Sequence, residues 1–318
     1  MVTLYYELVL VYTNCMPDEF TANALSNGDD GRKWLESIPL VIASCEKKWS
    51  LKVSPPFELS YNYVAPATRA DGTKAVLKIG FPKDREFKTE IQALEVFNGE
   101  GMVKLLEIDA ENSAILIEQV LPGKPLSQMA DDDEATKIIA RVMKKLWKPL
   151  PKNHSFITVK DWSSEIFDYH KNSSNEDGLI PMYLIDKATR LFIELLDSED
   201  EQVLVHGDLH HDNILASERD GWIVIDPKGI AAEPAYEVAA MIRNPYEKLK
   251  NIDDLDTLLR RRIKILSAEL NFDPERISKW CFVQTVLSAV WNVDNKKGTD
   301  HCTRVAEALL ATKQPCLF

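Results

Sequence analysis

Cysteine is scarce in this 318-residue chain, and none of its five cysteines forms a C-x-x-C pair with another. The number is odd and the spacings are irregular, which argues against a disulfide framework and against a zinc knuckle. A reducing compartment fits this pattern best, so we expect the protein to act in the cytoplasm.

Long hydrophobic runs are also missing, because no apolar stretch approaches the ~18 residues that span a bilayer. The opening segment Met1–Thr13 is apolar, but it contains Glu7 and lacks the basic region and cleavage signal of a secretory leader. We therefore expect no membrane partner and no secretion. We further hypothesise that Met16 is the natural start and that residues 1–15 are a non-native extension.

Positive charge is in deficit, since 38 Lys and Arg against 50 Asp and Glu give a formal net charge of −12. This balance argues against nucleic acid as the main partner and favours a cationic or neutral substrate. The remaining composition, with 45% hydrophobic and 28% charged residues, is that of an ordinary globular protein. At roughly 150 residues per domain, the length predicts about two compact units.

The character of the chain changes near residue 122. Residues 46–121 show strand patterns broken by turns, whereas the chain from Ser127 onward is mostly helical with one strand-rich island. Pro122-Gly123 marks the change, so we expect an N-terminal lobe over 1–122 and a C-terminal lobe over 123–318. Strands in one lobe and helices in the other predict an α+β fold.

Local patterns predict the main elements of both lobes. Residues 59–64 and 74–79 should form a hairpin around Asp71-Gly72, followed by a helix over 84–97 that stops at Asn98-Gly99. Two further strands are expected over 103–108 and 114–120. In the second lobe we expect helices over 131–147, 162–169, 180–196, 235–242, 252–270 and 274–291.

The most informative stretch, residues 203–229, reads VLVHGDLHHDNILASERDGWIVIDPKG. Its apolar segments 214–216 and 222–225 should pair as an antiparallel hairpin. The hairpin would bring Asn213 beside Asp226, and an amide oxygen next to a carboxylate suits magnesium. Asp208, on the loop that enters the hairpin, can face the same point without ligating the metal. A free carboxylate beside a magnesium site is the arrangement that phosphoryl transfer needs.

The motif HGDLHHDN followed by IDPKG resembles the catalytic loop and metal-binding segment of the aminoglycoside phosphotransferase family. The run from DPKG to EPAYE is most similar to its streptomycin 6-phosphotransferase and hydroxyurea phosphotransferase group. The resemblance implies a two-lobed protein-kinase-like fold, with an N-terminal antiparallel sheet, one key helix, and a mostly helical C-terminal lobe that carries a catalytic hairpin.

The resemblance also implies roles for individual residues. Asp208 would be the catalytic base, and Asn213 and Asp226 the metal ligands. His206 would order the loop through bonds to the backbone or the metal-binding segment, although a hydrogen-bonded core histidine explains it equally well. The neighbouring His210 and His211 fit solvent-facing loop positions.

Lys78 and Glu90 can be assigned from the residues themselves. Lys78 lies in an apolar strand, where an inward-facing amine needs an anionic partner. Glu90 lies on or beside the apolar stripe of the following helix, where an unpaired carboxylate would be unfavourable. Such a pair would aim the lysine at the α- and β-phosphates of a nucleotide, as in kinases. The alternative is two exposed charges that never meet.

The resemblance places a hinge at residues 118–122, where backbone groups of Gln119 and Leu121 would bind the purine edge. Between residues 59 and 71 there is no glycine, which argues against a glycine-rich phosphate flap. Backbone N–H groups of residues 65–70 could cover phosphate instead. Glu233 and Glu237 could contact a cationic acceptor, although Glu237 could also tie the following helix to the catalytic loop.

These residues predict a small-molecule kinase that transfers the γ-phosphoryl group of ATP or GTP, with Mg²⁺, to a hydroxyl of an aminoglycoside-like acceptor. The resemblance allows a streptomycin-type acceptor or hydroxyurea. One alternative is a metallohydrolase that uses the side chains of His206, Asp208, His210 and His211. Another is a pseudokinase that binds nucleotide without transfer. The sequence carries no signal for an oligomeric state.

Overall fold

The structure is a computed structural model that describes residues 17–172, 178–294 and 298–311. The proposed extension before Met16 lies outside the described residues. The chain divides into two compact units, Met1–Gly99 with Val103–Val120, and Glu100–Met102 with Leu121–Phe318. The short segment 100–102 belongs to the second unit because the N–H of Val224 donates to the carbonyl of Gly101 at 3.0 Å.

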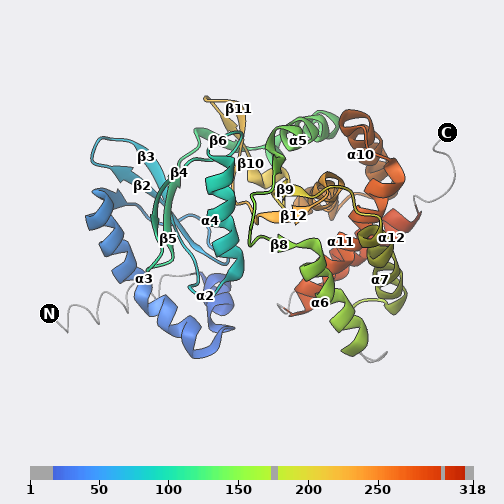
Figure 1. Cartoon of the computed structure of the whole chain (residues 1–318), viewed down its shortest axis with the longest axis horizontal. Coiled ribbons are helices and arrows are strands. Elements are labelled where there is room, and N and C mark those ends of the chain that lie inside the picture. Colours follow the sequence, from blue (N-terminus) through green and yellow to red (C-terminus); the bar gives the residue numbers. More distant parts are fainter. Residues whose placement is uncertain (1–16, 173–177, 295–297, 312–318) are drawn as a thin grey trace. The chain divides into compact units, whose positions relative to one another are not determined.

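The first unit is a five-stranded antiparallel sheet with helices, in the strand order β1-β2-β3-β5-β4 (Figure 1). Its elements are α2 (Asp18–Leu25), α3 (Gly28–Trp49), β1 (Leu51–Val53), β2 (Tyr63–Arg69), β3 (Lys74–Ile79), α4 (Arg85–Phe97), β4 (Leu105–Asp109) and β5 (Ala114–Glu118). The predicted helix over 84–97 is confirmed, and the Asp84 carboxylate caps it by accepting the N–H of Glu86 at 2.8 Å.

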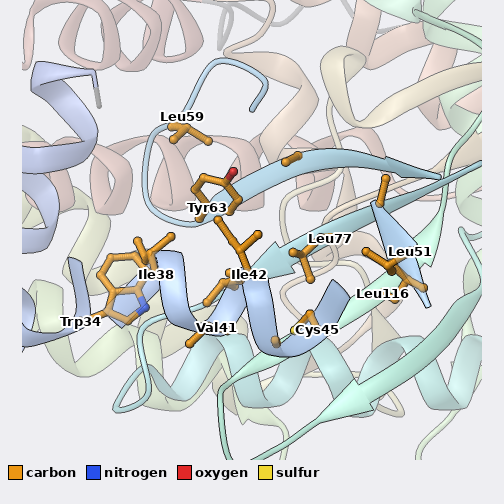
Figure 2. Close-up of a cluster of buried hydrophobic side chains, with 14 of the residues drawn as sticks. Trp34, Ile38, Val41, Ile42, Cys45, Leu51, Leu59, Tyr63, Leu77 and Leu116 are labelled. Carbon is orange, nitrogen blue, oxygen red and sulfur yellow. The ribbon is translucent and has the colours of Figure 1, made fainter. Parts of the chain in front are cut away.

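Helix α3 covers one face of this sheet with its apolar side (Figure 2). Trp34, Ile38 and Ile42 recur at helical spacing and join Leu77 and Leu116 of the sheet in one buried cluster. The sequence analysis did not predict α3, although this spacing is a signal that could have found it. Pro39 lies inside the helix, where proline is disfavoured, so local propensity counts against α3.

Strand β2 corrects two expectations, the strand over residues 59–64 and the backbone N–H groups of residues 65–70 as a cover for phosphate, because the strand runs from Tyr63 to Arg69. Residues 65–69 lie within β2, paired to β1 on one side and to β3 on the other. Ala65 and Ala67 alternate inward onto the α3 cluster, and alanine is a weak strand former, so the propensity signal failed. The turn at Asp71-Gly72 is as predicted, with Gly72 at φ 86°.

The second unit is mostly helical and contains two small sheets, with the strand orders β11-β10-β6 and β7-β9-β12-β8. Its strands are β6 (Pro122–Pro125), β7 (Lys148–Pro149), β8 (Ile157–Thr158), β9 (Val203–Val205), β10 (Ile214–Ser217), β11 (Gly221–Val224) and β12 (Ile230–Ala232). Its α-helices are α5 (Asp132–Leu146), α6 (Val159–Asn172), α7 (Met182–Asp197), α8 (Ala239–Ile242), α9 (Tyr246–Leu249), α10 (Leu255–Leu270), α11 (Pro274–Asp294) and α12 (Asp300–Ala311), and its 3-10 turns are η1 (Leu126–Gln128), η2 (His211–Asn213) and η3 (Pro234–Val238).

A buried ion pair ties the helices of this unit together. The Arg262 side chain of α10 is almost fully buried, and it donates to both carboxylate oxygens of Asp132 at 2.5 and 3.0 Å. Asp132 belongs to the acidic run that starts α5, which the sequence analysis placed at a helix start. The pair joins α5 to α10, because neither charge can be left unpaired in the interior.

Candidate active site

The HGD motif, residues 206–208, lies on the loop between β9 and η2 and follows directly after the last residue of β9. Asp208 is the most exposed of its three residues, with 29% of its side chain accessible to solvent. The predicted hairpin follows directly and is confirmed, since β10 pairs with β11 in the register Ile214 to Val224. The loop therefore holds Asp208 at the base of the hairpin.

His206 is buried and cross-links the loop to the end of β11. Its ring Nε2 lies 2.8 Å from the carbonyl oxygen of Ile225, and its Nδ1 accepts the backbone N–H of Asp208 at 3.1 Å. Burial lowers the pKa of His206 to about 4, so the ring is neutral at pH 7. These two bonds require the proton on Nε2. His206 therefore orients Asp208 and does not face a substrate itself.

Glu237 fixes the same loop from the other side. Its two carboxylate oxygens accept the backbone N–H groups of His206 at 2.6 Å and of Gly207 at 3.0 Å. Burial raises the pKa of Glu237 to about 7, while these backbone donors oppose that shift. Glu237 thus holds the catalytic loop in place, which is the second of the two roles suggested by the sequence.

Gly207 has a backbone conformation that other residues rarely adopt, with φ at 86°. A Cβ at this position would overlap the side chain of Ile230 and lie 3.3 Å from Cβ of Lys228. The close approach lets the carbonyl of His206 accept the N–H groups of Lys228 at 2.8 Å and of Gly229 at 3.2 Å. Glycine is therefore required between His206 and Asp208.

Glu233 is also directed into the interior. Its carboxylate accepts two hydrogen bonds from Arg276 at 2.6 Å, one from the indole of Trp280, and one from the N–H of Asp200 at 3.0 Å. Only 1% of its surface is exposed, as for Glu237. These bonds correct the expected contact of Glu233 and Glu237 with an acceptor. Both carboxylates are buried and accept hydrogen bonds from residues of the second unit.

Asn213 and Asp226 stand at the open end of the hairpin. The N–H of Ile225 donates to the carbonyl of Asn213 at 3.0 Å, so Asn213 lies opposite Ile225, and Asp226 follows one residue later with φ at 61°. Nδ2 of Asn213 donates to the carbonyl oxygen of Asp208 at 3.1 Å, which leaves Oδ1 as the atom that can ligate a metal. An amide oxygen and a carboxylate fit a hard cation such as Mg²⁺.

The histidines after Asp208 do not form a metal centre. His211 is buried, which corrects the solvent-facing position predicted for it, because η2 turns its ring inward to the region of Asp132 and Arg262. His210 caps η2 by accepting the N–H of Asp212 at 3.3 Å. Among the described residues, no group of three His, Cys, Asp or Glu side chains could hold a metal ion.

Arg243 is a charged neighbour of Asp208 that the sequence analysis missed. It lies just after α8, and its Nη2 is 3.4 Å from Oδ1 of Asp208. The two residues are 35 positions apart and no motif links them. Only the packing of the helices around the loop brings them together.

Lys78 and Glu90 form a buried ion pair within the first unit. Nζ of Lys78 lies 2.6 and 2.7 Å from the two carboxylate oxygens of Glu90. Side chains alternate along β3, so Leu77 and Ile79 face the α3 cluster while Lys78 faces α4. The alternative of two charges that never meet is wrong.

Gln119 and Leu121 follow β5, on either side of the residue at which the first unit ends. Leu121 is exposed, with 48% of its surface accessible, and its carbonyl accepts the N–H of Glu218 at 2.9 Å. Gln119 is half-buried.

Residues 51–296 match a family model described as "Aminoglycoside/hydroxyurea antibiotic resistance kinase". The chain belongs to this kinase family. It is 28% identical to a streptomycin 6-kinase of Streptomyces griseus, over 91% of this chain and 92% of the relative. It is also 28% identical to a hydroxyurea phosphotransferase of Kitasatospora aureofaciens, over 89% of this chain and 82% of the relative.

Solved structures of other kinases share the fold of this protein. A choline kinase of Streptococcus pneumoniae matches with a TM-score of 0.62 and 15% identity, over 86% of this chain and 98% of that one. An aminoglycoside phosphotransferase of Streptomyces rimosus, solved with ADP and streptomycin, matches with a TM-score of 0.54 and 16% identity, over 84% and 98%. The α+β, protein-kinase-like fold is thereby confirmed.

The expected enzyme class is confirmed by these comparisons. This protein is a phosphotransferase of the antibiotic-resistance type that uses a nucleotide and a small-molecule hydroxyl acceptor. Among the described residues, no helix is long and apolar enough to cross a bilayer.

Proposed function

We propose that this kinase transfers the γ-phosphoryl group of ATP or GTP to a hydroxyl of a streptomycin-type aminoglycoside. The observation that carries the proposal is the placement of Asp208, a partly exposed carboxylate on a loop that His206 and Glu237 fix from two sides. The acceptor class is supported by the similarity to the streptomycin 6-kinase of Streptomyces griseus. The net charge of −12 also favours a cationic acceptor.

In the proposed reaction, Asp208 accepts the proton of the acceptor hydroxyl and orients that oxygen for attack. Asn213 and Asp226 would hold Mg²⁺, which the amide oxygen of one and the carboxylate of the other suit. The metal, when bound, neutralises charge on the phosphate oxygens. His206 and Glu237 take no proton from the acceptor, and they keep the loop in the conformation that presents Asp208.

We assign the nucleotide-binding role to the N-terminal lobe, which ends at Val120 and not at residue 122, and the catalytic and acceptor-binding role to the second unit. Lys78, held by Glu90, contacts the α- and β-phosphates. Backbone groups of Gln119 and Leu121 bind the purine edge.

Hydroxyurea is the second acceptor that we consider, because the hydroxyurea phosphotransferase of Kitasatospora aureofaciens matches 89% of this chain, close to the 91% matched by the streptomycin 6-kinase of Streptomyces griseus. Hydroxyurea also carries a hydroxyl group that Asp208 could deprotonate. We place the reaction in the cytoplasm, where nucleoside triphosphates are available. The buried free thiols of Cys45, Cys281 and Cys302 fit a reducing compartment.

The test uses the purified full chain with Mg²⁺, γ-labelled ATP or GTP, and an acceptor panel of streptomycin, other aminoglycosides and hydroxyurea. We expect labelled streptomycin from the wild type. Asp208→Asn should lower kcat by about 10²- to 10⁴-fold, the usual effect of losing a positioned base. Asp220→Asn is the matched control, since Asp220 is an exposed aspartate in the turn of the same hairpin.

The outcomes separate the candidate functions. Labelled hydroxyurea without labelled streptomycin would favour the second acceptor. Nucleotide binding with no transfer to any acceptor of the panel would favour a pseudokinase. A loss of less than tenfold in kcat for Asp208→Asn would contradict the role proposed for Asp208.

A further inference from the structure

The side chain of Arg243 contacts one oxygen of the Asp208 carboxylate. Nη2 of the arginine lies 3.4 Å from Oδ1 of Asp208, and only 11% of the Arg243 side chain is exposed. The other terminal nitrogen, Nη1, donates to the side-chain oxygen of Gln284 and lies 3.5 Å from the carbonyl of Ala239. With its guanidinium held at both ends, Arg243 presents a fixed cation to Asp208.

The backbone around Arg243 is fixed as well. Nη1 of the buried Arg262 donates to three carbonyls that flank Arg243, those of Met241 at 3.1 Å, Ile242 at 3.3 Å and Asn244 at 2.6 Å. The carbonyl of Arg243 itself lies 2.8 Å from Nε2 of His301. Both the guanidinium of Arg243 and the backbone around it are therefore held in place, as a side chain that positions another one requires.

The two oxygens of Asp208 have different surroundings. Oδ1 faces the Arg243 guanidinium, whereas the ring nitrogen nearest to Oδ2 is Nε2 of His210 at 3.8 Å, which is beyond hydrogen-bond distance. A cation beside Oδ1 restricts the rotation of the carboxylate about its last bond. Oδ2 is then the oxygen that stays available to a substrate.

We propose that Arg243 is a positioning residue that holds Asp208 by Oδ1 and so assigns Oδ2 as the atom that accepts the proton. The inference rests on the proposed function of Asp208 as the base. In the step, the acceptor O–H bond breaks and its proton passes to Oδ2. The acceptor oxygen forms a bond to the γ-phosphorus, and the bond from that phosphorus to the β-phosphate oxygen breaks to release the nucleoside diphosphate.

The expected effect of removing the guanidinium is on the rate and not on binding. A base that rotates freely is misplaced for much of the time, and misplacement by about 1 Å can cost on the order of 10²-fold in rate. We therefore expect Arg243→Gln to lower kcat by about 10- to 100-fold with KM for nucleotide and acceptor changed less than threefold. Arg243→Lys keeps the charge but not the fork of donors, so it should recover part of the loss.

The test is a double-mutant cycle on the full chain, with kcat measured for streptomycin or hydroxyurea, whichever the wild type phosphorylates. Arg243→Gln, Asp208→Asn and the double variant are compared, with thermal unfolding as a check of folding. Arg260→Gln is the matched control, since Arg260 is a half-exposed arginine of α10 in the same unit, and its kcat should stay within twofold of the wild type. If Arg243→Gln does not fold, Arg243→Lys takes its place in the cycle.

If Arg243 acts through Asp208, the Arg243 substitution should cost less than threefold once Asp208 is already Asn. Equal losses in both backgrounds would overturn the inference and make Arg243 an independent phosphate or acceptor ligand. A full loss in Asp208→Asn with no loss in Arg243→Gln would overturn the inference alone. Wild-type activity in Asp208→Asn would overturn the proposed role of the base, and the inference with it.

Discussion

Replacing Gly207 by alanine tests whether the catalytic loop is built as described. Gly207 has φ at 86°, and an added Cβ would overlap Ile230, which lies in strand β12. The left-handed backbone conformation costs a residue with a Cβ roughly 1–2 kcal/mol. Overpacking against a buried side chain adds typically about 1–3 kcal/mol.

Gly221 provides a control that separates these two costs. It lies in the same unit, at the start of β11, with φ at 75°, and an added Cβ would meet nothing within 4 Å. Gly221→Ala should therefore show only the backbone cost. Gly207→Ala should lower the free energy of unfolding by about 1–3 kcal/mol more than Gly221→Ala does.

The assay is urea unfolding followed by tryptophan fluorescence, with the denaturant slope compared between variants to show that one transition is being measured. Gly207→Ala should also lower kcat, because the substitution sits next to Asp208, whereas Gly221→Ala should not. Equal stabilities of the two variants, within about 0.5 kcal/mol, would refute the argument for close packing behind the HGD motif.

Two further predictions concern buried charges. Lys78→Met should destabilise the first unit by about 3–5 kcal/mol, because it leaves the Glu90 carboxylate buried without its cation, and adding Glu90→Met should restore most of the loss in denaturant unfolding. His206 has a folded-state pKa of about 4 against 6.5 when unfolded, so the unfolded state binds more protons between these values and stability falls as pH drops through this window. The loss in the free energy of unfolding totals about 3 kcal/mol. The difference in this free energy between wild type and His206→Gln should therefore change by about 3 kcal/mol between pH 7 and pH 4. A constant difference would contradict the burial of a neutral ring.

Local patterns in the sequence were enough to predict the elements that carry the site. The hairpin of β10 and β11, the helix α4 and the contact of Lys78 with Glu90 all follow from apolar alternation, a turn signal and the cost of an unpaired buried charge. These are interactions over short stretches of chain, where spacing determines which side chains meet.

The features that were missed depend on long-range packing. Arg243 reaches Asp208 only because Arg262 and His301 hold its backbone from α10 and α12, and no local pattern encodes that contact. His211 looked like a loop residue, yet η2 turns it into the interior. Glu233 is a candidate acceptor contact in the sequence, but its carboxylate pairs with Arg276 of α11, which lies 43 residues further along the chain.

Asp208 and Asp226 have separate tasks in the proposed reaction, and nucleotide affinity measured with and without Mg²⁺ tests that separation most directly. Asp208→Asn should bind the magnesium complex of the triphosphate within threefold of the wild type while transferring almost none of it. Asp226→Asn should lose most of the gain in affinity that magnesium gives. A magnesium effect that is unchanged in Asp226→Asn, or abolished in Asp208→Asn, would contradict the central claim.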